Sequence, residues 1–161
     1  MVKQSAGLLA FRKGVETEFV FLVHPGGPYW AKRDLGSWSI PKGEFKSDEE
    51  GLTAARREFF EETGQKIDGD FIPLKSCRQA GGKTVYAWAV EAEVDENIVS
   101  NLFEMEWPPK SGRMVSIPEV DRGEWFSIDV AMTKILAGQR PLLSELQAII
   151  GASKSVRSAK D

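Results

Sequence analysis

Apolar residues alternate or recur at fixed intervals along most of the chain, and their spacing predicts its elements. Residues 5–12 and 18–24 are two largely apolar runs with Lys13-Gly14 between them, which predicts two strands joined by a turn. Residues 83–94 alternate with a period of two and predict a further strand. One face of that strand carries Thr84, Tyr86 and Trp88, and the other carries Val85, Ala87 and Ala89.

Helical spacing occurs in three segments. Leu52, Ala55 and Phe59 fall at i, i+3 and i+7 and predict an amphipathic helix. Residues 128–138 and 141–151 also carry a helical period, with start signals at Ser127 and Pro141. Residues 101–125 predict a loop with short extended pieces. The pattern as a whole predicts an α/β fold, with a mixed β-sheet and helices on its faces.

The chain predicts a single domain over residues 1–150. Its 161 residues, of which 42% are hydrophobic, are enough for one core. No internal repeat and no linker rich in proline or glycine divides them. Residues 151–161 are small, polar and basic, and we expect a flexible C-terminal tail there.

The ends of the first predicted helix are marked by capping signals. Ser47 stands three residues before Glu50. Ser47 is therefore expected to cap the N-terminus of the helix, while the Glu50 side chain accepts a hydrogen bond from the Ser47 backbone N–H. Gly64 fits a left-handed C-terminal cap. Gly51 and Ala54 are small residues, which would leave space on the acidic side of this helix.

Three carboxylates, Glu58, Glu61 and Glu62, fall within a sector of roughly 100° on this helix. They repel one another by about 0.2–0.5 kcal/mol per pair, and the helix dipole disfavours anions near the C-terminus. A sequence selected for stability alone would avoid them. Arg57 is placed to orient the cluster. Converging carboxylates favour Mg²⁺ or Mn²⁺, and a solvated acidic face is the alternative.

The residues around the carboxylates complete a known pattern. With U for a bulky apolar residue, the pattern G-x5-E-x7-R-E-U-x-E-E-x-G-U is matched by Gly43, Glu49, Arg57, Glu58, Phe59, Glu61, Glu62 and Gly64. The last position, Gln65, departs from it. A chance match of the fixed identities is on the order of 10⁻⁹ per start position. On this motif the chain resembles the Nudix (MutT-like) hydrolases.

The resemblance implies the Nudix α/β/α sandwich and the hydrolysis of a nucleoside diphosphate linked to another moiety. It implies Mg²⁺, or Mn²⁺ in its place, to neutralise phosphate oxygens and help to ionise the attacking water. By family position, Glu61 and Glu62 are the principal ligands, and the Gly43 carbonyl is a further one. Glu58 is implied as a ligand through water, as the general base, or as both, and Arg57 positions Glu58.

A further carboxylate is expected from a late loop. In the family it often lies six residues before a tryptophan that opens the next strand, and six residues before Trp125 is Glu119. We therefore expect Glu119 to join the metal site or to serve as the base. Glu124 is the nearest competitor, and a surface position for both residues is the alternative.

Residues near the motif indicate the substrate class. Pro41-Lys42-Gly43 resembles the dinucleoside polyphosphate and diphosphoinositol polyphosphate branches of the family, with Lys42 as a point charge for phosphate. Residues 83–88 resemble the strand of the smaller dinucleoside polyphosphate hydrolases, in which a lysine meets phosphate and an aromatic ring stacks on a base. This maps to Lys83 and Tyr86, and core packing is the alternative for Tyr86.

The turn-rich loop over residues 24–38 contains further candidates. Tyr29 and Trp30 form an aromatic pair beside Lys32 and Arg33. These residues are expected to hold a base and its phosphates, unless the rings close the loop over the sheet and the cations are solvated. His24 is the single histidine, and a structural or loop-bonding role is expected for it. Trp107-Pro108-Pro109 is consistent with a flap over the substrate or with a rigid turn.

Charge and composition exclude several function classes. A net charge of −3 gives no general attraction to nucleic acid or to an anionic membrane, so the expected partner is a small nucleotide. Cys77 is the single cysteine and cannot form an internal disulfide. No signal peptide or membrane span is predicted, and a cytoplasmic location follows as the default. The oligomeric state is not readable from the sequence.

We therefore predict Mg²⁺-dependent hydrolysis of a phosphoanhydride bond, with a dinucleoside polyphosphate as the first candidate substrate. Among enzymes, the alternatives are a MutT-like (d)NTP pyrophosphohydrolase and a diphosphoinositol polyphosphate phosphohydrolase. Outside enzymes, the alternative is a non-catalytic nucleotide-binding Nudix module. Such modules usually lose the glutamates that this chain retains.

Overall fold

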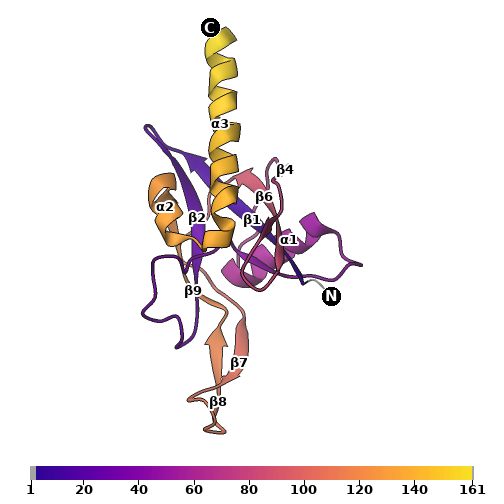
Figure 1. Cartoon of the computed structure of the whole chain (residues 1–161), viewed down its shortest axis with the longest axis vertical. Helices are drawn as coiled ribbons and strands as arrows, with labels where there is room; N and C mark the ends of the chain where they lie inside the picture. Colours follow the sequence, from indigo (N-terminus) through magenta and orange to yellow (C-terminus); the bar gives the residue numbers. More distant parts are fainter. Residues whose placement is uncertain (1–2, 161) are drawn as a thin grey trace.

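The computed structural model describes the backbone of residues 3–160 and the side chains of residues 3–153. The strands are β1 (Gln4–Lys13), β2 (Glu18–Pro25), β3 (Lys42–Glu44), β4 (Ile72–Pro73), β5 (Cys77–Arg78), β6 (Thr84–Glu91), β7 (Leu102–Glu106), β8 (Met114–Pro118) and β9 (Val120–Ser127). The helices are α1 (Gly51–Thr63), α2 (Ile128–Lys134) and α3 (Arg140–Lys160), with a 3₁₀ turn at Ala137–Gln139. Figure 1 shows one body, from which the β7–β8 hairpin and the end of α3 project in opposite directions.

The main sheet is mixed, as the sequence predicts. Its strands follow the order β4-β6-β1-β2-β9, while β3 pairs with β1 and β5 pairs with β6. β1 and β2 form the predicted pair, with Phe11 opposite Val20. β6 is the predicted alternating strand and lies parallel to β1. The remaining pairs of this sheet are antiparallel.

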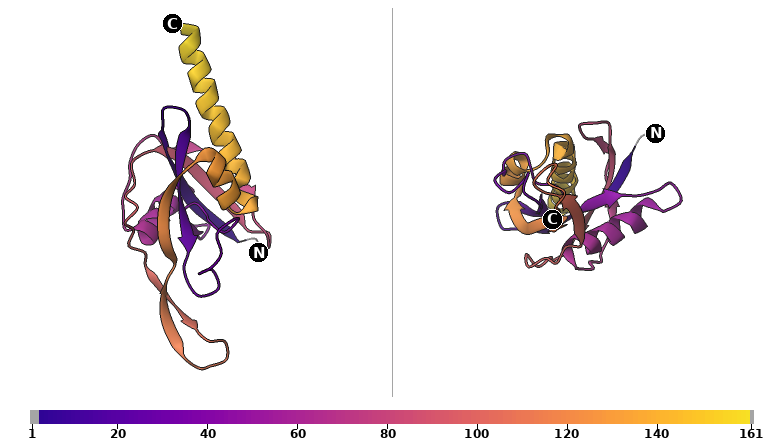
Figure 2. Two further views of the ribbon diagram at one scale, coloured as in Figure 1. Left: turned by 90° about the vertical axis from the view of Figure 1, so that its left-hand side faces the viewer. Right: turned by 90° about the horizontal axis from the view of Figure 1, so that it is seen from below.

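Two hydrophobic cores lie on opposite faces of the sheet. α1 covers one face, where Phe59 belongs to the same core as Leu8 of β1. α2 and α3 cover the other face, where Ile128 and Leu142 belong to the core of Leu9 (Figure 2). Successive residues of β1 therefore face different cores, which explains the unbroken apolar run in this strand. The predicted α/β/α sandwich is confirmed.

The acidic helix starts later than predicted. α1 follows an N-cap at Glu50 and no side chain caps it, so the predicted Ser47–Glu50 capping box is wrong. Ser47 lies in a turn, which the Glu49 N–H closes by donating to the Lys46 carbonyl (3.0 Å). The Glu49 carboxylate is bound by Arg57, two turns into the helix. This ion pair ties the segment that precedes α1 to the helix.

Both ends of α1 depend on glycine. At Gly64 the backbone is left-handed (φ 74°) and its N–H donates to the Phe60 carbonyl (2.7 Å), which confirms the predicted C-terminal cap. At Gly51 a Cβ would lie 2.8 Å from the Trp88 ring on β6. The space predicted beside Gly51 is therefore filled by an indole, and the small residue permits close packing of helix and sheet.

Residues 101–125 are more regular than the predicted loop. β7 and β8 form a two-stranded sheet, with Phe103 opposite Ile117 and Met105 opposite Val115. β9 follows as the outer strand of the main sheet, next to β2. The hairpin is short and projects from the body (Figures 1 and 2). Its pairing depends on contacts across the two strands, which a local pattern does not contain.

The chain ends in a long helix. α3 continues through residues 151–160, where the sequence predicts a flexible tail. The predicted boundary at residue 150 therefore falls inside a continuous helix, and the mobility of the tail stays a prediction. Within residues 3–160, no helix combines the length and the apolar content needed to cross a membrane.

Candidate active site

Three carboxylates, two from α1 and one from a distant part of the chain, meet beside the second half of this helix. Glu58 and Glu62 lie one turn apart on this helix, and Glu119 lies at the junction of β8 and β9. One oxygen of each carboxylate lies within 4.8 Å of the other two. Glu58 and Glu62 are both 7% exposed. Oxygen atoms at this spacing suit a divalent cation such as Mg²⁺ or Mn²⁺.

Backbone contacts on both sides hold Glu119 in place. Its N–H donates to the Asn101 carbonyl, and its own carbonyl accepts the Gly26 N–H, both at 3.0 Å. A Cβ at Gly26 would lie 2.0 Å from the Pro118 oxygen, so the close approach of these segments requires glycine. Of the two late carboxylates, Glu119 is the one brought to the cluster, while Glu124 lies within β9.

β3 brings its backbone against the same carboxylates. The Lys42 N–H donates to Glu62 Oε1 at 3.1 Å. A Cβ at Gly43 would lie 1.9 Å from Glu58 Oε2, so glycine is needed for the close approach of strand and helix. The Gly43 backbone therefore lies next to the cluster, and the role of its carbonyl as a metal ligand stays a prediction.

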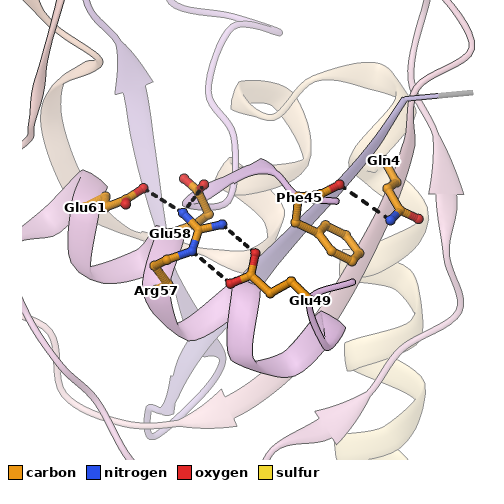
Figure 3. Close-up of polar contacts among 6 residues, drawn as sticks. All are labelled: Gln4, Phe45, Glu49, Arg57, Glu58 and Glu61. Carbon is orange, nitrogen blue, oxygen red and sulfur yellow. Dashed lines mark hydrogen bonds and ion pairs between the residues drawn. The ribbon is translucent and has the colours of Figure 1, made fainter. Parts of the chain in front are cut away.

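Arg57 connects the carboxylates of α1 to the segment that precedes the helix. It donates two hydrogen bonds to Glu49, both at 2.9 Å (Figure 3). Its Nη1 also donates to Glu58 Oε1 (2.8 Å) and to Glu61 Oε2 (3.1 Å). The expected orienting contact with Glu58 is thus present. Among the described residues, the close group of three carboxylates contains Glu119 in place of Glu61, the expected principal ligand. A ligand role for Glu61 stays a prediction.

The surroundings of these carboxylates disfavour negative charge. Burial raises the pKa of Glu62 to about 8, and burial together with the neighbouring Glu61 raises the pKa of Glu58 to about 7. Burial and the charge of Glu61 also raise the pKa of Glu119. A bound divalent cation would offset both the poor solvation and the mutual repulsion, so these residues fit a metal site.

A cavity of about 190 Å³ adjoins the carboxylates. Glu62 and Glu119 line it, together with the predicted phosphate-binding Lys42 and the predicted base-binding Trp30. Its other walls are formed by Val23, Pro25, Ser37, Ser39, Val120 and Leu136. Most of these wall residues were not predicted, because no local pattern marks them. Leu136, for example, is held there by a hydrogen bond from its N–H to the distant Trp38 carbonyl (2.8 Å).

His24 fastens the loop that carries Trp30 and Arg33. Its side chain is fully buried, with Nδ1 2.8 Å from Asp121 Oδ1 and Nε2 2.6 Å from the Arg33 carbonyl oxygen. The loop-bonding role predicted for His24 is confirmed. The Arg33 guanidinium lies 5.4 Å from the centre of the Trp30 ring. Of these two predicted substrate residues, Trp30 lines the cavity and Arg33 does not.

Lys83 and Tyr86 lie outside the cavity. Lys83 forms an ion pair with Glu44 (3.1 Å), and the Tyr86 ring meets Phe45 edge-on at 6.2 Å. Tyr86 is 39% exposed, which excludes the alternative of core packing. The hydrogen bond and the charge of Lys83, and then the charges of Lys3 and Lys42, lower the pKa of the Glu44 carboxyl. Lys83 and Lys3 are the ion-pair partners of Glu44, and Lys42 lies two residues before Glu44 on β3.

Comparison with known proteins agrees with this geometry. A sequence profile of the NUDIX domain matches residues 1–146. No protein with a curated annotation matches the chain. Similar solved structures include an Ap4A hydrolase from C. elegans in a binary complex, with a TM-score of 0.65 and 21% identity over 92% of this chain and 98% of that chain.

Two further solved structures share the architecture. The E. coli ORF135 protein matches with a TM-score of 0.60 and 19% identity, over 94% of this chain and 92% of that chain. The NUDIX domain of Shewanella oneidensis NrtR, complexed with ADP ribose, matches with a TM-score of 0.55 and 15% identity, over 97% and 89%. At these identities the structural likeness shows a shared fold.

The family follows from the profile match, which covers nearly the whole chain. Nudix hydrolases generally use a divalent metal ion, and the group formed by Glu58, Glu62 and Glu119 is compatible with one. The profile match, the complete glutamate motif and the shared fold lead to one conclusion: the chain belongs to the Nudix family and is a hydrolase.

Proposed function

We propose that the protein hydrolyses a phosphoanhydride bond in a nucleoside diphosphate linked to another moiety, with Mg²⁺ as cofactor and a dinucleoside polyphosphate as substrate. The observation that carries this proposal is the meeting of Glu58, Glu62 and Glu119 at a cavity lined by Lys42 and Trp30. Carboxylates for a cation, an ammonium group for phosphate and an aromatic ring for a base are the parts that this reaction needs.

The proposed metal ligands come from α1, from the backbone of β3 and from the β8–β9 junction. They are Glu58, Glu61, Glu62, Glu119 and the Gly43 carbonyl. A bound Mg²⁺ would neutralise phosphate oxygens and make a water molecule more acidic, and Mn²⁺ would serve in its place. Arg57 holds one oxygen each of Glu58 and Glu61, so it orients both side chains toward the site.

Glu58 is the proposed general base. Arg57 fixes its Oε1 (2.8 Å), and its Oε2 faces the Gly43 backbone. A pKa of about 7, raised chiefly by burial, suits a group that must accept a proton near neutral pH. Glu119 is the alternative base, because burial raises its pKa as well.

The distribution of cations supports a long phosphate chain. Lys42 lines the cavity, and Glu44, two residues farther along β3, pairs with Lys83 (3.1 Å) and with Lys3 (3.9 Å). Positive charge therefore continues beyond the cavity, farther than one triphosphate needs. Phosphate would replace Glu44 as the partner of Lys83. Trp30 is the proposed base contact in the cavity, with Arg33 close to its ring, and the exposed Tyr86 is a second candidate.

The test is a comparison of kcat/KM for diadenosine tetraphosphate, dGTP, ATP, ADP-ribose and a diphosphoinositol polyphosphate at one Mg²⁺ concentration. We expect diadenosine tetraphosphate to be preferred, with asymmetric cleavage into ATP and AMP. Lys83→Ala should raise KM for this substrate more than for ATP, because the shorter chain makes that contact poorly. Lys75→Ala, an exposed lysine away from the cavity, is the matched control.

Two results would redirect the proposal. A preference of about tenfold or more for either triphosphate, equivalent to about 1.4 kcal/mol of transition-state binding, would favour the MutT-like alternative. Preference for the inositol substrate would favour the diphosphoinositol branch. No turnover of any substrate, combined with nucleotide binding, would favour the non-catalytic module.

A further inference from the structure

The β7–β8 hairpin has one apolar face, and that face is turned toward the loop beside the cavity. Cross-strand pairing places Phe103 opposite Ile117 and Met105 opposite Val115 on this face. A Cβ at Gly27 would lie 3.5 Å from Ile117 Cγ2 and 3.9 Å from Met105 Sδ, so the hairpin packs against this loop. The opposite face is mixed, and its alternating positions carry Leu102, Glu104, Glu106, Met114, Ser116 and Pro118.

The apolar face ends in a pair of aromatic rings. The ring centres of Tyr29 and Trp107 lie 5.2 Å apart, with an interplanar angle of 73°. Tyr29 is 59% exposed, although it lies against the hairpin. Its neighbour Trp30 lines the cavity. The aromatic pair on the hairpin is therefore separated along the loop by a single step from a residue of the cavity wall.

The aromatic pair is anchored to the candidate metal site. Glu119 directly follows the last residue of β8 and is bound on both sides, by Asn101 before β7 and by Gly26 in the loop. Gly26 packs against Pro118 without room for a side chain. The same contacts that position Glu119 therefore hold the hairpin against the loop that carries Tyr29.

The cavity can hold only part of a dinucleoside substrate. Its volume of about 190 Å³ is below the roughly 300–1,000 Å³ of ordinary small-molecule sites. The remainder of a long substrate must lie on the surface outside the cavity. Tyr29 and Trp107 offer partly exposed aromatic surface there, and aromatic rings stack on any nucleobase because every base has a flat face.

We propose that Tyr29 and Trp107 form a stacking platform for the second nucleobase of the substrate, outside the cavity: the base stacks on the face of one ring, and the other ring, nearly perpendicular to it, holds that ring in place. This assignment rests on the proposed function in its dinucleotide form. Stacking of this kind is tolerant of base identity, so the platform would recognise a flat heterocycle at the far end of the phosphate chain without selecting among bases.

The test compares diadenosine tetraphosphate with adenosine 5′-tetraphosphate, which has the same number of phosphates and one base. We expect Trp107→Ala to lower kcat/KM about tenfold or more for the dinucleotide, mainly through KM, and less than about twofold for the mononucleotide. Met114→Ala, on the opposite face of the same hairpin and 60% exposed, should change neither. An equal loss for both substrates, or no loss for either, would overturn the platform.

Two further measurements separate the platform from folding and from the proposed function. Tyr29→Ala should reproduce the selective loss, and Trp107→Phe should restore most of it, with melting temperatures near that of the wild type. Binding of diadenosine tetraphosphate to Glu58→Gln protein in Mg²⁺ is measured by calorimetry, so it does not depend on turnover. If the double variant Glu58→Gln, Trp107→Ala binds the dinucleotide about tenfold more weakly than Glu58→Gln alone, the platform is supported even if hydrolysis is absent.

The same face is also open to a second copy of the chain, and sedimentation distinguishes this case. If Trp107→Ala converts a dimer into a monomer and leaves binding of diadenosine tetraphosphate unchanged, the face is a subunit contact and the platform is overturned. A monomeric wild type with selective loss of dinucleotide binding supports the platform.

Discussion

Glu49 and Arg57 are joined by two hydrogen bonds, Nε–Oε2 and Nη2–Oε1, each 2.9 Å long. Glu49 lies before α1 and Arg57 lies in its second turn, so the pair closes the start of the helix (Figure 3). Bidentate pairing fixes the plane of the guanidinium group. The remaining nitrogen of that group, Nη1, then determines where Glu58 Oε1 and Glu61 Oε2 lie.

This arrangement predicts a positioning role for Glu49. We expect Glu49→Gln to lower kcat or the Mg²⁺ affinity by roughly 10–100-fold, because Arg57 would no longer be held in one plane. Activity is measured over a Mg²⁺ titration at saturating substrate. Glu50→Gln is the matched control, since Glu50 is the adjacent N-cap and makes no side-chain capping bond. Equal activity of the two variants would contradict the role.

The proposed base is tested with Glu58→Gln. The substitution keeps the size of the side chain and removes its basic oxygen, so kcat should fall by roughly 10²–10⁴. The melting temperature of the metal-free protein should hold or rise, because a poorly solvated carboxylate is removed. Glu119→Gln is measured beside it. If Glu119→Gln loses activity while Glu58→Gln stays near the wild type, Glu119 is the base.

The pKa shifts of Glu58 and Glu62 predict how metal-free stability depends on pH. Their folded pKa values of about 7 and about 8 lie above the ordinary value of 4.5 for a glutamate. Between these values the folded state binds more protons than the unfolded state, so the free energy of unfolding falls as pH rises from about 4.5 to 8. The melting temperature in EDTA should therefore be higher at pH 5.5 than at pH 8.5.

Mg²⁺ should reverse this loss. The cation binds the ionised carboxylates of the folded protein, so the rise in melting temperature on adding Mg²⁺ should be larger at pH 8.5 than at pH 5.5. Hydrolysis should vanish in EDTA and return with Mg²⁺ or Mn²⁺. Glu62→Gln should weaken both the pH dependence and the Mg²⁺ effect. Full activity after complete chelation would remove the basis for a metal site.

Gly43 is predicted to be intolerant of a side chain. A Cβ at this position would lie 1.9 Å from Glu58 Oε2, so Gly43→Ala should displace the carboxylate and lower kcat/KM by about 100-fold. The Mg²⁺-induced rise in melting temperature should shrink as well. Gly151→Ala is the control, because nothing lies within 4 Å of its Cβ position in α3. This variant should be fully active and more stable by roughly 0.5–1 kcal/mol.

Much of the site was predictable from one continuous segment. Glu58 and Glu62 are four residues apart, and helical geometry alone brings such residues to the same side. The left-handed cap at Gly64 was equally local, since it depends on the conformational freedom of one residue. The apolar run of β1 and the alternation of β6 were also read correctly, because they report how the two faces of a strand are buried.

The remaining features depend on contacts between segments far apart in the chain. The N-cap of the helix is Glu50 and not Ser47, and Glu49, which lies between them, is bound by Arg57 from within the helix. Leu136, in the wall of the cavity, donates its backbone N–H to the distant Trp38 carbonyl. Glu119 reaches the carboxylates of α1 only because Asn101 and Gly26 hold it there. By itself, the sequence determined the family, the secondary structure of its periodic segments and the carboxylates of the helix, since a repeating backbone geometry places neighbours relative to one another. Family resemblance indicated Glu119 as the carboxylate that joins them. Tertiary structure decided how Glu119 reaches them, where the cations gather and what forms the cavity, because these depend on packing between elements whose separation no local pattern encodes.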